Sequence, residues 1–185
     1  MAELSKYQKQ LSKEGVCVLT NIIPEDLLFL LSTYFQKREF EKRLILQDTA
    51  SEFTLKEGPA NDKLTAFFNQ KKIHNLFSDI TGEKIRYITQ RLYYNTIETV
   101  PLGWHIDTRE DHTKTDRIAA LRLELSDSPY TGGQFEIEMA KDKKLLFPQL
   151  EYGQAIIFKI EKDFQHRVTQ VESGIRKSLN LFICK

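Results

Sequence analysis

A succession of short strands in the second half of the sequence constrains the fold more than any other feature. From Lys84 onward, segments rich in β-branched and aromatic residues are separated by turn signals such as Ser128-Pro129, Gly132-Gly133 and Ser173-Gly174. The predicted strands are residues 85–94, 118–125, 134–138, 154–160, 164–171 and 175–184. Many such strands after a helical start predict a mainly β fold, a sandwich or barrel of the jelly-roll type braced by helices.

The first half of the sequence is predicted to be largely helical. Gly15 and Gly82 favour the left-handed conformation found at helix C-termini, and Pro24 favours a helix start. We expect helices over residues 2–14, from Pro24 through Phe35 and, as two short pieces, over 61–80, with a buried strand at 16–19 and strand and loop between 38 and 59. A chain of 185 residues fits one domain, residues 1–185, in which 1–83 supply helical support and first strands and 84–185 form the β core.

Charge and cysteine content narrow the class of protein. The 27 Lys and Arg residues nearly balance the 26 Asp and Glu residues, so no net field favours nucleic acid or an anionic membrane. Cys17 and Cys184, at opposite ends, are too few for a disulfide scaffold and favour a reducing setting. No apolar run reaches the length of a membrane span. We expect a cytoplasmic protein that binds neither nucleic acid nor membrane.

The tripeptide His105-Ile106-Asp107 is the starting point for function. On a strand, residues two apart project to the same face, so the imidazole and the carboxylate can reach one metal ion. A third ligand is expected from a distant strand, and His166 lies in the predicted strand after Phe164. Two histidines and one carboxylate that leave coordination positions open favour a non-haem iron(II) site. The alternative for His105 is a strand histidine satisfied by ordinary hydrogen bonds.

Arg176 adds a second element. Alternation along the last strand places Arg176, Ser178 and Asn180 on one face. The other face is apolar and consists of Ile175, Leu179, Leu181 and Ile183. Burying a guanidinium inside the barrel is unfavourable in free energy unless an anion pairs with it. A carboxylate can do so, because it accepts two parallel hydrogen bonds from the planar guanidinium. The pattern therefore favours a dicarboxylate ligand.

At this point the sequence resembles a known family, the prolyl-4-hydroxylase-like branch of the iron(II)/2-oxoglutarate oxygenases. The resemblance rests on motifs that occur in order between residues 84 and 184. These motifs are Tyr93-Tyr94, Trp104-His105-Ile106-Asp107, Gly132-Gly133-Gln134-Phe135, Gly153-Gln154-Ala155-Ile156-Ile157-Phe158, His166-Arg167-Val168-Thr169-Gln170-Val171 and Gly174-Ile175-Arg176-Lys177-Ser178.

The resemblance implies a double-stranded β-helix (cupin-like) in which His105, Asp107 and His166 bind Fe(II). It also implies that Arg176 pairs with the C5 carboxylate of 2-oxoglutarate, that Ser178 assists, and that Tyr94 or Tyr93 helps to hold this co-substrate. Dioxygen would be the second co-substrate, with succinate and carbon dioxide as products. Related halogenases replace the metal carboxylate with a small residue, so the presence of Asp107 implies hydroxylation and not halogenation.

Three further residues are substrate-binding candidates with an open alternative each. Arg122 interrupts an apolar strand and is either a surface residue, the slightly preferred interpretation, or an anchor for a substrate carboxylate. Arg109 lies in the polar run 108–117, which is either a solvated loop or a lid over the substrate. Trp104 either packs near the opening of the metal site or belongs to the hydrophobic core.

The predicted function is hydroxylation of an unactivated C–H bond of a small molecule, such as an amino acid or a biosynthetic intermediate. A protein or peptide side chain is the alternative substrate within the same mechanism. A non-catalytic cupin-like module that binds a metal or a carboxylate is the alternative from another class. Nothing in the sequence indicates the oligomeric state.

Overall fold

The computed structural model describes residues 2–21, 23–36, 40–45, 50–107, 116–139, 143–146, 149–161 and 164–185. Its helices are α1 (Ala2–Glu14), α2 (Glu25–Gln36), α3 (Pro59–Phe68) and α4 (Lys71–Thr81). Its strands are β1 (Val16–Leu19), β2 (Phe40–Ile45), β3 (Ala50–Leu55), β4 (Tyr87–Asn95), β5 (Arg117–Glu124), β6 (Thr131–Gly132), β7 (Phe135–Met139), β8 (Lys143–Leu146), β9 (Ala155–Lys159), β10 (Phe164–Val168), β11 (Val171–Ser173) and β12 (Arg176–Cys184).

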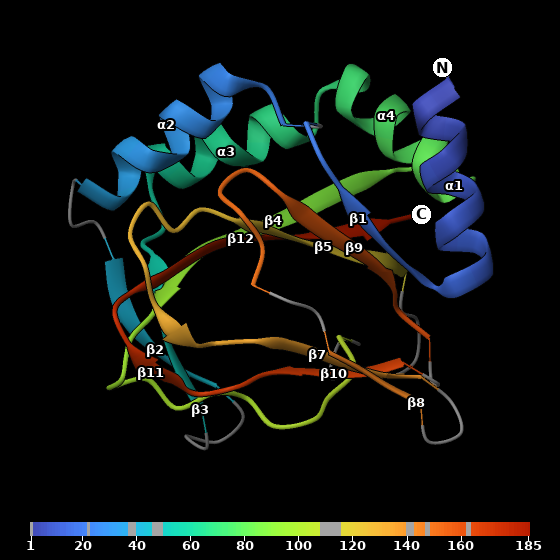
Figure 1. Cartoon of the computed structure of the whole chain (residues 1–185). Helices are drawn as coiled ribbons and strands as arrows, with labels where there is room; N and C mark the ends of the chain where they lie inside the picture. The colour runs from blue at the N-terminus through green and yellow to red at the C-terminus, as the bar shows by residue number, and fades with distance from the viewer. Residues whose placement is uncertain are drawn as a thin grey trace.

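Two antiparallel sheets face each other beneath a layer of helices (Figure 1). The larger sheet has the strand order β1-β9-β5-β12-β4-β3-β2, and the smaller one has the order β10-β7-β8. The short pair β11-β6 lies beside them. Strands from both halves of the chain therefore join the large sheet. This arrangement confirms the predicted mainly β fold with a double-stranded β-helix core braced by helices.

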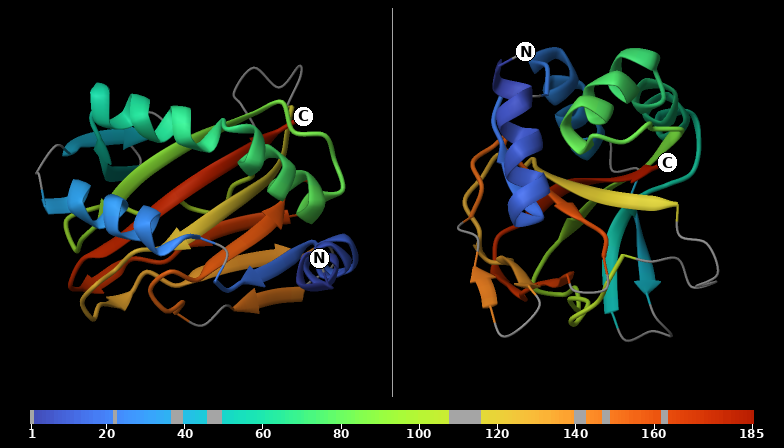
Figure 2. Two further views of the ribbon diagram at one scale, coloured as in Figure 1. Left: turned by 90° about the horizontal axis from the view of Figure 1, so that it is seen from above. Right: turned by 90° about the vertical axis from the view of Figure 1, so that its right-hand side faces the viewer.

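The four helices cover the outer face of the large sheet (Figure 2). The core between them contains buried leucines and isoleucines from both layers, for example Leu31 of α2, Leu64 of α3 and Leu121 of β5. Gly15 and Gly82 follow α1 and α4 with φ of 72° and 76°, as expected of residues that end helices. The helices thus cover one face of the large sheet, and its other face is turned toward the small sheet (Figure 1 and Figure 2).

A second core lies on the inner face, between the two sheets. It includes Ala120 of β5, Phe135 and Ile137 of β7, Phe158 of β9 and Phe182 of β12. Because helices cover one face and the small sheet covers the other, the central strands β5 and β12 are buried on both faces.

Several boundaries differ from the sequence prediction. The strand predicted over 164–171 is two strands, β10 and β11, because Gln170 leaves the ladder and its carbonyl accepts a hydrogen bond from the Gly133 N–H. Residues 38–59 contain the hairpin β2-β3, and the strands β6 and β8 were not predicted. Ile175, predicted to face the core, precedes β12 and is 46% exposed. None of the described helices has the length and apolar character needed to span a bilayer.

Candidate metal centre and co-substrate pocket

Three side chains from separate parts of the sequence meet at one point. His105, Asp107 and His166 each offer one ligand atom, and these atoms lie within 4.8 Å of one another. Nε2 of His105 is 3.5 Å from Oδ1 of Asp107, and Nε2 of His166 is 3.2 Å from Oδ2 of the same carboxylate. The structure therefore brings together the three residues that the sequence predicts as metal ligands.

The backbone sets the two imidazoles beside each other. His105 and His166 form an isolated antiparallel bridge, in which each N–H donates to the carbonyl of the other at 3.0 and 2.9 Å. The rings lie side by side, with centroids 4.3 Å apart. The bridge is a single residue pair, so His105 and Asp107 lie on an extended segment that is not part of a regular strand.

The electrostatics of the three side chains suit a cation. Burial opposes ionisation of Asp107, but His105 and His166 hold the pKa of its carboxyl well below the usual range. Burial lowers the pKa of His166, so its imidazole is neutral and offers a lone pair. Nδ1 of His105 lies 2.8 Å from the Gly103 carbonyl, which can only accept, so Nδ1 carries the proton and Nε2 is left as a ligand atom. Two imidazole nitrogens and one carboxylate fit Fe(II).

Arg176 and Ser178 carry unpaired polar atoms on the inner face of β12. The Arg176 side chain is 3% exposed, and its Nε and Nη1 have no hydrogen-bond partner within the described part of the chain. Ser178 is fully buried, and its Oγ likewise has none among the described residues. Burial opposes the charge on Arg176, yet Tyr93 and Glu124 raise its pKa above the ordinary value. Such donors fit a carboxylate, which a guanidinium binds through two parallel hydrogen bonds.

Glu124 and Gly133 position Arg176, and Glu124 was missed in the sequence. Its Oε2 lies 4.0 Å from Nη2 of Arg176 and accepts a hydrogen bond of 2.9 Å from the Tyr130 hydroxyl. Gly133 has φ of 61°, and a Cβ there would come within 2.7 Å of Cδ of Arg176. The second glycine of the Gly-Gly turn therefore gives the arginine side chain its room.

The two candidate tyrosines lie on opposite faces of β4. Tyr93 is 4% exposed, points inward and donates a hydrogen bond of 3.3 Å to Oδ1 of Asn180. The Tyr94 ring stacks on Phe53 at 4.7 Å and meets Phe40 edge-on at 5.2 Å, away from the three metal-binding side chains. Because neighbouring strand residues face opposite ways, Tyr93 and not Tyr94 lies on the inner side, opposite Ser178 in the register of β4 and β12.

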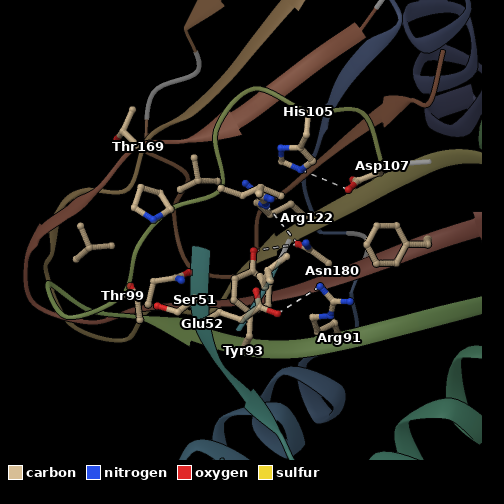
Figure 3. A pocket seen from close by; sticks show the side chains of 17 residues that line it. Ser51, Glu52, Arg91, Tyr93, Thr99, His105, Asp107, Arg122, Thr169 and Asn180 are labelled. Atoms are coloured by element: carbon tan, nitrogen blue, oxygen red, sulfur yellow. Dashed lines mark hydrogen bonds and ion pairs between the residues drawn. The ribbon is translucent and has the colours of Figure 1, made fainter. Parts of the chain in front are cut away.

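Arg122 is buried, which contradicts the preferred prediction of a surface residue. It is 6% exposed and lines the same cavity as His105 and Asp107 (Figure 3). Its Nε donates to Oδ1 of Asn180 at 3.2 Å, and its guanidinium lies 4.9 Å from the Phe135 ring centroid. The polar face of β5 points between the sheets and not to solvent, so the alternative prediction for Arg122 agrees with its position.

Most residues that line the cavity beside the metal-binding side chains are polar or charged, although the larger part of its lining surface is apolar. Of its seventeen described lining residues, eleven are polar or charged. They include Glu52 and Arg91, which form an ion pair of 3.3 Å and which sequence reasoning missed (Figure 3). The signal for Glu52 was its place in an alternating strand, but the low regularity of residues 38–59 hid it. Arg176 and Ser178 are not among the lining residues and lie deeper, on the side of Glu124.

The remaining two substrate candidates are placed differently. Trp104 is partly buried, and the Arg167 guanidinium stacks on its ring at 4.7 Å from the centroid. Arg167 also pairs with Glu136 at 2.6 Å, so Trp104 packs against a fixed ion pair beside His105. Arg109 lies outside the described residues.

Comparison with known proteins agrees with this site. The profile of the 2OG-Fe(II) oxygenase superfamily matches residues 90–184, which are 95 of the 185 residues and include His105, Asp107, His166 and Arg176. No curated protein gives a significant sequence match.

Three solved structures illustrate the likeness in fold. A prolyl-4-hydroxylase from Pseudomonas putida is 16% identical, with a TM-score of 0.75 over 98% of both chains. A 2OG-Fe(II) oxygenase family oxidoreductase from Burkholderia pseudomallei is 17% identical, with a TM-score of 0.76 over 98% of this chain and 89% of the other. A prolyl hydroxylase from Trichoplax adhaerens, solved with a hypoxia inducible factor peptide fragment, is 15% identical, with a TM-score of 0.74 over the same shares.

Identity this low shows a common fold, whereas the profile match over half of the chain shows the family. The matched segment carries the paired histidines, the carboxylate and the buried arginine whose geometry suits iron and a dicarboxylate. This chain therefore belongs to the 2OG-Fe(II) oxygenase superfamily, whose enzymes use Fe(II), 2-oxoglutarate and O2.

Proposed function

We propose that this oxygenase hydroxylates a C–H bond of a small polar molecule. The observation that carries the proposal is the pair of unmatched groups inside the fold, the Arg176 guanidinium and the Ser178 hydroxyl, which face the space between the two sheets where the His-Asp-His cluster also lies. Buried donors without partners among the described residues are costly unless a ligand accepts their hydrogen bonds.

Each residue has a defined part in this proposal. His105, Asp107 and His166 hold Fe(II), while Arg176 binds the distal carboxylate of 2-oxoglutarate. Ser178 and Tyr93, which are paired across β12 and β4, would donate further hydrogen bonds to the co-substrate. The buried walls exclude water, so that the co-substrate is held in one orientation.

When bound, the iron supplies the activation of dioxygen; one oxygen atom ends in succinate and the other in the product hydroxyl, with loss of carbon dioxide. The chain itself positions the metal and the co-substrate and neutralises their charges. The Asp107 carboxylate stays ionised because both histidines hold its pKa low, and it thus keeps its place as an anionic ligand.

The lining of the cavity supports a polar, compact substrate. Glu52, Arg91, Arg122 and Asn180 approach from four strands of the large sheet, β3, β4, β5 and β12. A cavity with several charged groups favours a ligand that returns their hydrogen bonds. The predicted cytoplasmic location and the predicted absence of a nucleic-acid partner stay predictions.

A peptide side chain is the second candidate substrate. Two of the similar structures are prolyl hydroxylases, one of them solved with a peptide fragment. The cavity rim also carries apolar residues, Pro101 and Leu102, next to Val100, which is 53% exposed. This rim offers an extended chain a contact surface.

The test is anaerobic titration of the iron-loaded protein with 2-oxoglutarate, followed by exposure to air. A weak visible metal-to-ligand charge-transfer band, and succinate formed without added substrate, are the expected results. Folded, iron-loaded protein that shows neither signal would refute the proposal. Succinate assays with added small molecules and added peptides then distinguish the two substrate classes.

A further inference from the structure

Arg122 differs from the other buried charged residues. Three buried carboxylates and their arginines form ion pairs: Glu52 with Arg91 at 3.3 Å, Glu124 with Arg176 at 4.0 Å and Glu136 with Arg167 at 2.6 Å. Arg122 has no ion-pair partner among the residues that the structure describes. Its Nε donates to a neutral amide, and its Nη1 is buried without a hydrogen bond.

The contacts of Arg122 fix the orientation of its guanidinium group. Asn180 accepts from both Nε of Arg122 and the Tyr93 hydroxyl, so the guanidinium is held from one side (Figure 3). The Phe135 ring packs against it at 4.9 Å. Arg122 lines the cavity with His105 and Asp107, and its buried Nη1 is the donor that a ligand beside the metal centre would have to reach.

A buried guanidinium without a carboxylate is unfavourable, and an anion in the cavity would offset that cost. A substrate carboxylate would supply such an anion, because it accepts two parallel hydrogen bonds from an arginine fork. In the proposed function Arg176 already binds the distal carboxylate of 2-oxoglutarate, so Arg122 can bind a carboxylate of the substrate.

Glu52 supplies the opposite charge in the same cavity. It is 7% exposed, and burial raises the pKa of its carboxyl against the pull of Arg91. The ion pair with Arg91 is not aligned as a hydrogen bond, and Oε1 has no hydrogen-bond partner in the described part of the chain. Arg43 and Arg122 also lower this pKa, and Oε1 is the carboxylate atom that would accept a hydrogen bond from a ligand ammonium.

We infer that the substrate is a small zwitterion, most simply a free amino acid, whose carboxylate binds Arg122 and whose ammonium binds Glu52. The inference rests on the proposed function and names the substrate class of the same site. The two groups come from β5 and β3, so they hold the substrate at two points of the cavity wall. Two opposite charges at fixed positions set the orientation of a zwitterion relative to the metal centre.

The test is calorimetric titration of the anaerobic protein, loaded with Fe(II) and 2-oxoglutarate, with the twenty L-amino acids in turn. The amino acid that binds most tightly is then compared with its amide, which lacks the carboxylate, and with its N-acetyl derivative, which lacks the ammonium. We expect both derivatives to bind the wild-type protein at least about 10-fold more weakly, since each loses a charge-assisted pair.

Two variants assign the two charges. Arg122→Gln should weaken binding of the free amino acid by about 100-fold and leave binding of its amide unchanged. Glu52→Gln should weaken binding of the free amino acid and leave binding of its N-acetyl derivative unchanged. Arg122→Lys, which keeps the charge, should restore part of the affinity. Arg86→Gln, a change at an exposed arginine outside the cavity, is the matched control.

Three results would overturn the inference and leave intact the proposal that the site binds Fe(II) and 2-oxoglutarate. One is a protein that shows the charge-transfer band with 2-oxoglutarate but binds no amino acid. Another is a peptide-like probe, blocked at both ends, that binds as tightly as the free amino acid. The third is an Arg122→Gln protein whose 2-oxoglutarate affinity falls as far as its amino-acid affinity, because Arg122 would then serve the co-substrate. Loss of the band itself in wild-type protein would refute the proposed function.

Discussion

The sharpest prediction concerns Arg176→Ala, which should weaken 2-oxoglutarate binding far more than iron binding. In the proposed complex the arginine donates from Nε and Nη1, the two atoms that lack partners among the described residues. A hydrogen bond to a charged group contributes about 1.5–3 kcal/mol, so loss of two such bonds removes about 3 kcal/mol after water replaces part of the contact. That energy corresponds to about 100-fold in the dissociation constant.

The variant is expected to fold, because the carboxylate left behind keeps other partners. Glu124 still accepts hydrogen bonds of 2.9 Å from the Tyr130 hydroxyl and from the Ser126 N–H. Arg176→Lys retains the charge but not the planar fork, so its 2-oxoglutarate affinity should fall between those of the wild type and the alanine variant. Arg86→Ala, at an exposed position, is the control for loss of a guanidinium.

The assay is the charge-transfer band during anaerobic titration with 2-oxoglutarate, with iron affinity measured separately and thermal unfolding as the check on folding. An Arg176→Ala protein that is folded and binds 2-oxoglutarate as tightly as the wild type would refute the reasoning. Equal losses of iron and 2-oxoglutarate affinity would also refute it, because the change would then act on the whole site.

The remaining predictions test the metal, the tyrosine face and the Gly-Gly turn. Asp107→Ala should abolish iron-dependent succinate formation, since the metal loses its anionic ligand; turnover near the wild-type rate would show that Asp107 is not a ligand. Tyr93→Phe should weaken 2-oxoglutarate binding in the band titration whereas Tyr94→Phe should not, because only the first side chain points inward; the reverse order would contradict the face assignment. Gly132→Ala should destabilise the protein by more than about 1 kcal/mol in chemical unfolding, because its φ is 70° and a Cβ would meet the Gln170 carbonyl oxygen at 2.1 Å; Gly103→Ala, with open space around it, is the control, and equal stabilities would count against the clash.

Local spacing in the sequence was enough to predict the three candidate metal ligands that the structure brings together and to place Arg176 on the inner face of its strand. His105 and Asp107 are two residues apart, so an extended backbone places them on one side even though the segment forms only one bridge. Arg176 and Ser178 follow the same rule on β12, where the polar side of the strand stands out against leucines and isoleucines. The mainly β fold followed from strand-forming segments and turn residues, which are also local signals.

Tertiary structure alone decided which polar face is interior. The central strands of the large sheet are covered by helices on one side and by the small sheet on the other, so alternation between apolar and polar residues does not separate core from solvent. For this reason Arg122 was expected at the surface, and either Tyr93 or Tyr94 was acceptable as a ligand contact.

Contacts between distant segments could likewise not be predicted from the sequence. Glu52 and Arg91 pair across β3 and β4, while Arg122 and Asn180 meet across β5 and β12. No spacing rule relates residues 39 or 58 positions apart, because the pairing depends on strand order and register in the folded sheet. The sequence by itself thus indicated the reaction class, whereas the arrangement of charges around the cavity exists only in the tertiary structure.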